Sequence, residues 1–246
     1  MIHYHGSPLG GPASELSKFY SRRHAMVSFA NPQDIAVVAE CCQSFALDNG
    51  AYTAWKGGDR VDVDKYLEWV DIWDKHPAFD WALIPDVIDG DESENDQMIR
   101  MCRDSKDTMV PIWHLNESLN KLGKLTREWP IVAFGSSGEY GNPGSEVWHK
   151  RMDVAMVIAC DSKQRPVTKF HGLWMLDPMI VQRYPLSSAD STTAVRNSAY
   201  EVKFGAYPHP NRWGRASVVA DIIESVQSPP TYDKDHQFEL KFALNY

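Results

Sequence analysis

The chain has 246 residues and a formal net charge of −8, with 43% hydrophobic and 24% charged residues. This acidic balance argues against a protein that coats nucleic acid non-specifically, since such binding rests on many cationic contacts to phosphates. No apolar run is long enough to span a bilayer, and the N-terminus lacks the pattern of a secretory signal, so we expect a cytoplasmic protein without a membrane partner.

Short apolar runs alternate along the chain with amphipathic stretches of helical period. The predicted strands are Ile2–His5, Ala25–Phe29, Ser44–Leu47, Trp81–Pro85, Met109–Trp113, Ile131–Gly135, Thr168–Gly172 and Leu186–Ala189. The predicted helices are Ala13–Arg22, Pro32–Cys42, Val63–Lys75, Glu92–Ser105, Glu117–Trp129, Ser145–Cys160 and Asp177–Tyr184. Asp62 suits a helix N-cap, and Asn31 followed by Pro32 suits a cap with proline at the first helical position.

Eight strands that alternate with helices predict a parallel sheet, because each parallel return needs a crossover. Eight such units can close into a (β/α)₈ TIM barrel, which leaves no exposed edge. An open doubly wound sheet is the main alternative, but the chain lacks a glycine-rich phosphate fingerprint. We expect a single domain, with the barrel over about residues 1–205 and a helical appendage over about 206–246.

Polar side chains recur where the predicted strands end, which is where barrels of this kind place their functional groups. Asp48 and Asn49 follow the third strand, Asp86 the fourth, His114 the fifth and Asp190 the eighth. A single aspartate at such a position is typical of a helix N-cap. Three of them at one barrel mouth, together with histidines, favour a functional site instead.

Carboxylates in separate environments suit glycosidic chemistry at a nucleoside. An ionised carboxylate can attack the sugar carbon and form a covalent glycosyl-enzyme. A second carboxyl group can transfer a proton to or from the departing base. A third can accept hydrogen bonds from the N–H groups of a purine-like ring.

The phrases SFALDNGAYTAW, ALIPDVIDG, VAFGSSGEYG, KFHGLWML and YPLSSADST span Phe45 to Thr192. In these phrases the chain resembles the tRNA-guanine transglycosylase superfamily, and most closely its shorter phage and bacterial members, which insert 7-deazaguanines into DNA. The resemblance implies a base-exchange transglycosylase without a cofactor.

The resemblance also implies roles for individual residues. Asp190 matches the nucleophile, Asp48 the aspartate assigned to proton transfer, and Asp86 the group that reads the polar edge of the base. The other residues expected to contact the substrate are Asn49, His114, Gly135, Ser136, Ser137, His171 and Gly172. His171 and Gly172 are expected to flank the face of the base.

Differences from the tRNA enzymes indicate which kind of nucleic acid is the substrate. The tRNA enzymes carry a C-terminal cysteine-rich zinc site, and no cysteine follows Cys160 here, which favours DNA or a free nucleoside over tRNA. A base in a duplex must be flipped out to reach the cavity. Contacts to nucleic acid are predicted for a mixed cationic and aromatic cluster, Arg196, Lys203, Arg212, Trp213 and Arg215, for which an ordinary solvated helix face is the alternative.

Two other functions remain open. His3 and His5 lie on the same side of a strand, and if they pointed into the barrel they could bind a metal with His114, His171 and Asp190. That pattern resembles the amidohydrolase superfamily, in which a metal activates water for hydrolysis. The third possibility is a nucleobase N-glycosidase or a non-catalytic barrel that only binds a modified base.

Overall fold

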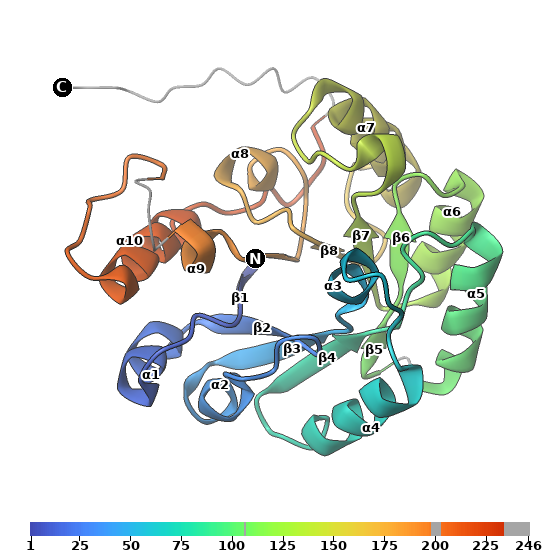
Figure 1. The fold of residues 1–246 in the computed structure, drawn as a ribbon. Helices are drawn as coiled ribbons and strands as arrows, with labels where there is room; N and C mark the ends of the chain where they lie inside the picture. Colours follow the sequence, from blue (N-terminus) through green and yellow to red (C-terminus); the bar gives the residue numbers. More distant parts are fainter. Residues whose placement is uncertain (106, 198–202, 234–246) are drawn as a thin grey trace.

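Nine parallel strands form one curved sheet, and helices surround it on the outside (Figure 1). The structure is a computed structural model that describes residues 1–105, 107–197 and 203–233. The strands are β1 (Ile2–Gly6), β2 (His24–Ser28), β3 (Ser44–Asp48), β4 (Phe79–Leu83), β5 (Met109–Val110), β6 (Ile112–His114), β7 (Ile131–Gly135), β8 (Lys169–Gly172) and β9 (Ser188–Ser191). Their order in the sheet is β5-β4-β3-β2-β1-β9-β8-β7-β6.

The two ends of this sheet, β5 and β6, are separated only by Pro111. Proline has no N–H to give to a strand ladder, which interrupts the strand at this residue. β5 still pairs with β4, β6 pairs with β7, and the Pro111 carbonyl accepts a hydrogen bond from the Ala133 N–H at 2.9 Å. The sheet is therefore a nearly closed barrel with the eight expected strand positions, and the predicted α/β barrel fold is confirmed.

Helices follow most strands, as the alternating pattern predicts. They are α1 (Ala13–Tyr20), α2 (Ile35–Cys41), α3 (Ala51–Lys56), α4 (Val63–Trp73), α5 (Glu92–Met101), α6 (Leu119–Glu128), α7 (Glu146–Ala159), α8 (Pro178–Val181), α9 (Thr193–Asn197) and α10 (Arg212–Glu224), with 3₁₀ turns η1 (Arg103–Ser105) and η2 (Gly138–Tyr140). Asp62 caps α4 as predicted, accepting from the Lys65 N–H. None of the described helices is long and apolar enough to cross a membrane.

Each predicted helix is present but shorter than its predicted range, and one helix after β3 was not predicted. α2 begins at Ile35 rather than Pro32, and the Asp34 side chain before it accepts hydrogen bonds from the Leu9 and Gly10 N–H groups. α3 was not predicted; it begins directly after Gly50, whose φ is +76°. A Cβ at Gly50 would lie 2.8 Å from the Ala30 nitrogen, so this turn requires glycine.

Apolar side chains fill both sides of the sheet. The interior of the barrel holds a small cluster, namely Tyr4, Met26, Ala46, Trp81, Leu83, Val110, Ile112 and Ala133. A much larger cluster lies between the strands and the outer helices. Because side chains alternate along a strand, Tyr4 on β1 points inward while its neighbours His3 and His5 point outward.

The outward face of β1 is covered by α10 and the residues that follow it. His5 Nε2 lies 2.8 Å from Glu224 Oε1, and His3 Nε2 lies 2.7 Å from the Val226 carbonyl. Arg23 donates to Glu224 and to Asp221. α10, which belongs to the predicted C-terminal appendage, thus packs beside α1 as the last helix of the outer layer.

The Glu224 carboxylate joins two buried cationic or polar groups, so its removal should destabilise the fold. Burial raises the pKa of Glu224, but hydrogen bonding to His5 and the charge of Arg23 outweigh it and lower the pKa below its usual value. We expect Glu224→Ala to cost about 1.5–3 kcal/mol of unfolding free energy in urea denaturation. Because folding lowers this pKa, the stabilisation is present above the unfolded value of about 4.3 and is lost as the pH falls through the folded value.

The matched control is Glu146→Ala, which removes a salt bridge between exposed side chains on α7. It should leave the unfolding free energy unchanged within error. Equal stability of the Glu224→Ala variant and the wild type at neutral pH would contradict the role assigned to Glu224.

Candidate active site at the mouth of the barrel

A cavity of about 590 Å³ opens at the carboxyl ends of the strands. This volume is in the range of pockets that hold small-molecule ligands. Eight of the residues predicted from the sequence line it: Asp48, Asn49, Asp86, His114, Gly135, Ser136, Ser137 and Asp190. The three aspartates come from separate strands or the loops that follow them, and the structure brings them to one cavity.

Asp48 is the last residue of β3 and is partly buried. Its Oδ2 accepts a hydrogen bond from the Gly50 N–H at 3.2 Å. Burial raises the pKa of Asp48, and the nearby carboxylates of Asp190 and Asp86 contribute to a value of about 6. Asp48 can therefore change its protonation state close to neutral pH.

Asp190 lies within β9, whereas the predicted strand ended one residue before it, at Ala189. Only 5% of Asp190 is exposed. Its Oδ1 accepts a hydrogen bond from the Trp174 N–H at 3.0 Å. The same oxygen lies 3.4 Å from His171 Nε2. The Trp174 hydrogen bond thus orients the carboxylate at the cavity wall, with the His171 ring beside it at longer range.

His171 and Gly172 are not among the residues that line the cavity, and their expected contact with a bound base stays a prediction. His171 is fully buried inside the barrel, where its ring packs against Trp81 at 4.7 Å and its Nδ1 lies 2.9 Å from Ser188 Oγ. Gly172 packs against Met175 and Leu186. His171 contacts Asp190 from below, so any influence on a ligand passes through that carboxylate.

Asp86 and His114 belong to a chain of buried polar groups. Asp86 Oδ1 accepts from Asn49 Nδ2 at 2.8 Å, and Oδ2 lies 2.9 Å from His114 Nε2. On its other side, His114 Nδ1 lies 3.6 Å from Glu117 Oε1, which accepts from Lys121 Nζ at 2.7 Å. Burial lowers the pKa of His114, but the two flanking carboxylates outweigh it and raise the pKa to about 9. His114 is therefore an imidazolium at neutral pH.

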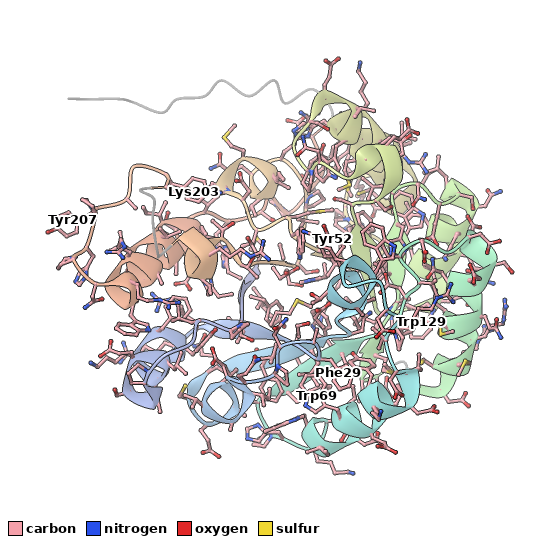
Figure 2. All side chains as sticks on the ribbon, in the orientation of Figure 1. Phe29, Tyr52, Trp69, Trp129, Lys203 and Tyr207 are labelled. Carbon is pink, nitrogen blue, oxygen red and sulfur yellow. The ribbon has the colours of Figure 1, made fainter. Side chains whose placement is uncertain are left out.

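Three aromatic residues at the cavity were not among the predicted site residues. Tyr52 and Trp55 lie on α3, and Trp174 lies in the loop between β8 and α8; all three line the cavity and are exposed. Tyr52 lies near the centre of the view in Figure 2. A sequence signal existed, since Tyr52 and Trp55 are three residues apart directly after a functional strand end, but no helix was predicted there.

The predicted nucleic-acid cluster lies away from the cavity, and much of it contacts the protein itself. Arg212 donates to the Leu9 carbonyl, Trp213 Nε1 to the Gly10 carbonyl at 3.1 Å, and Arg215 to the His209 carbonyl at 2.7 Å. Arg196 is exposed, and Lys203 lies over the Phe204 ring. Contact of these five residues with nucleic acid stays a prediction, and the structure gives three of them a role in holding loops.

The metal site considered in the alternative hypothesis requires histidines that point into the barrel. His3 and His5 point outward and contact residues in and after α10, so they cannot join His171 and Asp190. Among the residues that the structure describes, no group of three or more His, Cys, Asp or Glu side chains could hold a metal ion. The geometric premise of that hypothesis is therefore contradicted.

No protein-family model matches this chain, and no curated protein is similar to it. Among solved structures, it is similar to a chain from Aquifex aeolicus VF5 that is described only as a structural study of a project target. The identity is 10% and the TM-score 0.44, over 88% of this chain and 97% of the other. A similarity at this level carries no inference about function.

The crowding of carboxylates at the cavity can be tested on Asp48. In carbon-13 NMR titrations, the Asp48 carboxyl should titrate near pH 6, and Asp190→Asn should lower that pKa because it removes a neighbouring like charge. Asp62, an exposed helix cap far from the cavity, should titrate in its own low range in both proteins. An Asp48 pKa that does not respond to Asp190→Asn would show that the two carboxylates are not electrostatically coupled.

The charge state of His114 gives a second test. Its imidazolium signals in NMR should persist to about pH 9 in the wild type. Glu117→Gln removes one of the two flanking carboxylates and should lower the pKa of His114. Asp96→Asn is the control, because Asp96 contacts Lys121 at 3.1 Å but not His114, and it should shift this pKa less. Neutral His114 at pH 7 in the wild type would contradict the assignment.

Proposed function

We propose that this protein is a transglycosylase that exchanges a guanine-type base for a 7-deazaguanine in nucleic acid, with DNA favoured over tRNA. The observation that carries the proposal is the convergence of Asp48, Asp86 and Asp190 on one cavity of about 590 Å³, each in a different electrostatic environment. The resemblance of the surrounding sequence phrases to transglycosylases supports the same assignment.

Asp190 is the proposed nucleophile. Its Oδ1 is anchored by the Trp174 N–H and His171, and we assign the attack on the anomeric carbon to Oδ2. The attack forms an ester bond between Asp190 and the sugar and breaks the glycosidic bond, whose electron pair leaves with the base. Attack by a ring nitrogen of the incoming base then releases Asp190 and completes the exchange.

Asp48 is the proposed proton carrier. A pKa of about 6 lets it give a proton to the departing base and take one from the incoming base near neutral pH. Its position across the same cavity from the nucleophile fits this role. Burial and the like charge of Asp190 raise the pKa of Asp48, so Asp48 can hold the proton that the departing base takes up.

Asp86 and His114 are the proposed readers of the base. The His114 ring and the Asn49 amide both contact Asp86, and a carboxylate group at this place offers oxygens that accept hydrogen bonds. An acceptor of this kind suits the N–H and amino groups on the edge of a guanine-type ring. Gly135 contacts His114 and leaves room beside it, since a Cβ at this position would lie 3.2 Å from the imidazole.

The proposal predicts a covalent adduct. Incubation with a guanine-containing oligonucleotide should yield a species linked through Asp190, detectable by mass spectrometry of the denatured protein and its peptides. Asp190→Ala should abolish both the adduct and base exchange while it retains binding of the base. Absence of any Asp190-linked species, with exchange still observed, would overturn the assigned mechanism.

Two further variants separate the roles of the other aspartates. Asp48→Asn should lower turnover by roughly 10²- to 10⁴-fold, the range for loss of a general acid–base group, with a smaller effect on binding. Asp86→Asn introduces a donor and should change which base is accepted. Wild-type exchange rates and base preference in both variants would contradict these assignments. Release of free base without incorporation of a new one would indicate a glycosidase.

A further inference from the structure

Exposed aromatic side chains gather at the mouth of the cavity. Tyr52, Trp55 and Trp174 are 40%, 44% and 51% exposed, respectively. Within the described part of the chain, they are three of the four large aromatic side chains that are exposed. Single exposed apolar residues are ordinary, but a group of them around a cavity is typical of a binding surface. We call these three residues the aromatic shelf.

The three rings of the shelf are not stacked face to face on one another. The Tyr52 ring lies 4.9 Å from that of Trp174, at an interplanar angle of 75°, and 5.9 Å from that of Trp55, at 40°. The Tyr52–Trp174 pair meets edge to face and the Tyr52–Trp55 pair is tilted, so neither pair has two whole ring faces stacked together. Lys56 adds a positive charge beside the shelf, with its Nζ 5.8 Å from the Tyr52 ring centroid.

Trp174 has a backbone conformation that bulky residues rarely adopt, with φ of +58°. This conformation costs on the order of 1–3 kcal/mol. It directs the Trp174 N–H to Asp190 while the ring meets Tyr52 at the rim. A half-exposed ring gains little from burial in the protein, so the conformation indicates a role at the site.

We infer that the aromatic shelf binds an unpaired nucleobase that neighbours the one held in the cavity. This inference rests on the proposed function. The three aspartates and the shelf line the same cavity, so a base held at the aspartates leaves its neighbour in the strand beside the shelf. Every base has a flat π face, and aromatic side chains beside a cation are the surface on which unpaired bases stack. The substrate is therefore a strand that is unpaired around the target base.

The inference predicts a loss of affinity for single strands when the shelf is truncated. The probe is a fluorescently labelled single-stranded oligodeoxynucleotide with one central guanine, and the readout is anisotropy. All proteins carry Asp190→Asn, so that covalent attachment does not disturb the equilibrium. Trp55→Ala should raise the Kd by about ten-fold, which is within the range for loss of one stacked base. Trp55→Phe should retain most of the affinity.

The control is Tyr207→Ala, since Tyr207 is 66% exposed but does not line the cavity (Figure 2). It should leave the Kd near the starting value. The Kd for a free guanine nucleoside is measured as well, since a nucleoside has no neighbouring base to stack on the shelf. Trp55→Ala should raise the Kd for the oligonucleotide several-fold more than the Kd for the nucleoside.

Three outcomes would overturn the inference. They are an unchanged Kd for Trp55→Ala, an equal loss for Tyr207→Ala, and equal losses for nucleoside and oligonucleotide. Failure of the parent protein to bind single strands would also overturn it. The proposed function fails on a different measurement, the absence of base exchange and of an Asp190 adduct in the protein that retains Asp190, so the two failures are distinguishable.

Discussion

Mutual repulsion among three carboxylates governs how the mouth of this barrel is built. Asp48, Asp86 and Asp190 line one cavity, and like charges at short range cannot all persist without compensation. Each carboxylate is compensated in a different way. The pKa of Asp48 is raised, Asp86 lies between Asn49 and the His114 imidazolium, and Asp190 accepts a hydrogen bond from a backbone N–H. The barrel allows this because its strand ends bring the three aspartates to one cavity, while each carboxylate has different neighbouring groups.

Much of the polar structure behind the cavity follows from that repulsion. Glu117 and Lys121 are almost fully buried and form an ion pair with each other, and Glu117 also lies close to the His114 ring. Buried charges are costly unless they are paired, so their presence indicates that the charge on His114 is worth maintaining. At Asp190 the compensation comes from the backbone of Trp174, which ties the same loop to the rim of the cavity.

The sequence allowed the barrel and eight of the residues that line the cavity to be predicted, because both depend on local pattern. Alternating apolar runs identify strands, and Asp48, Asp86 and Asp190 were predictable as residues at strand ends. The side of a strand on which a residue lies was harder to predict, since a shift of one residue reverses it. His171 was expected at the ligand but lies inside the barrel, and His3 and His5, possible metal ligands, lie outside it.

Contacts between distant segments could not be read from the sequence at all. The hydrogen bonds of Arg212 and Trp213 to the Leu9–Gly10 segment join residues 203 apart, so the sequence did not show that these two side chains also anchor a loop. α3 was missed because six residues after a left-handed glycine show no helical period of their own. The aromatic shelf could therefore be recognised only from the structure.

The cover that α10 gives to β1 has a consequence for biosynthesis. His5 on β1 and Glu224 on α10 are 219 residues apart, so β1 contacts a helix that is synthesised much later. Contacts of such long sequence separation form late and slow folding. During synthesis α1 can already contact His5 through Phe19, but the polar contacts on the outer side of β1 are complete only once Glu224 and Val226 have been made.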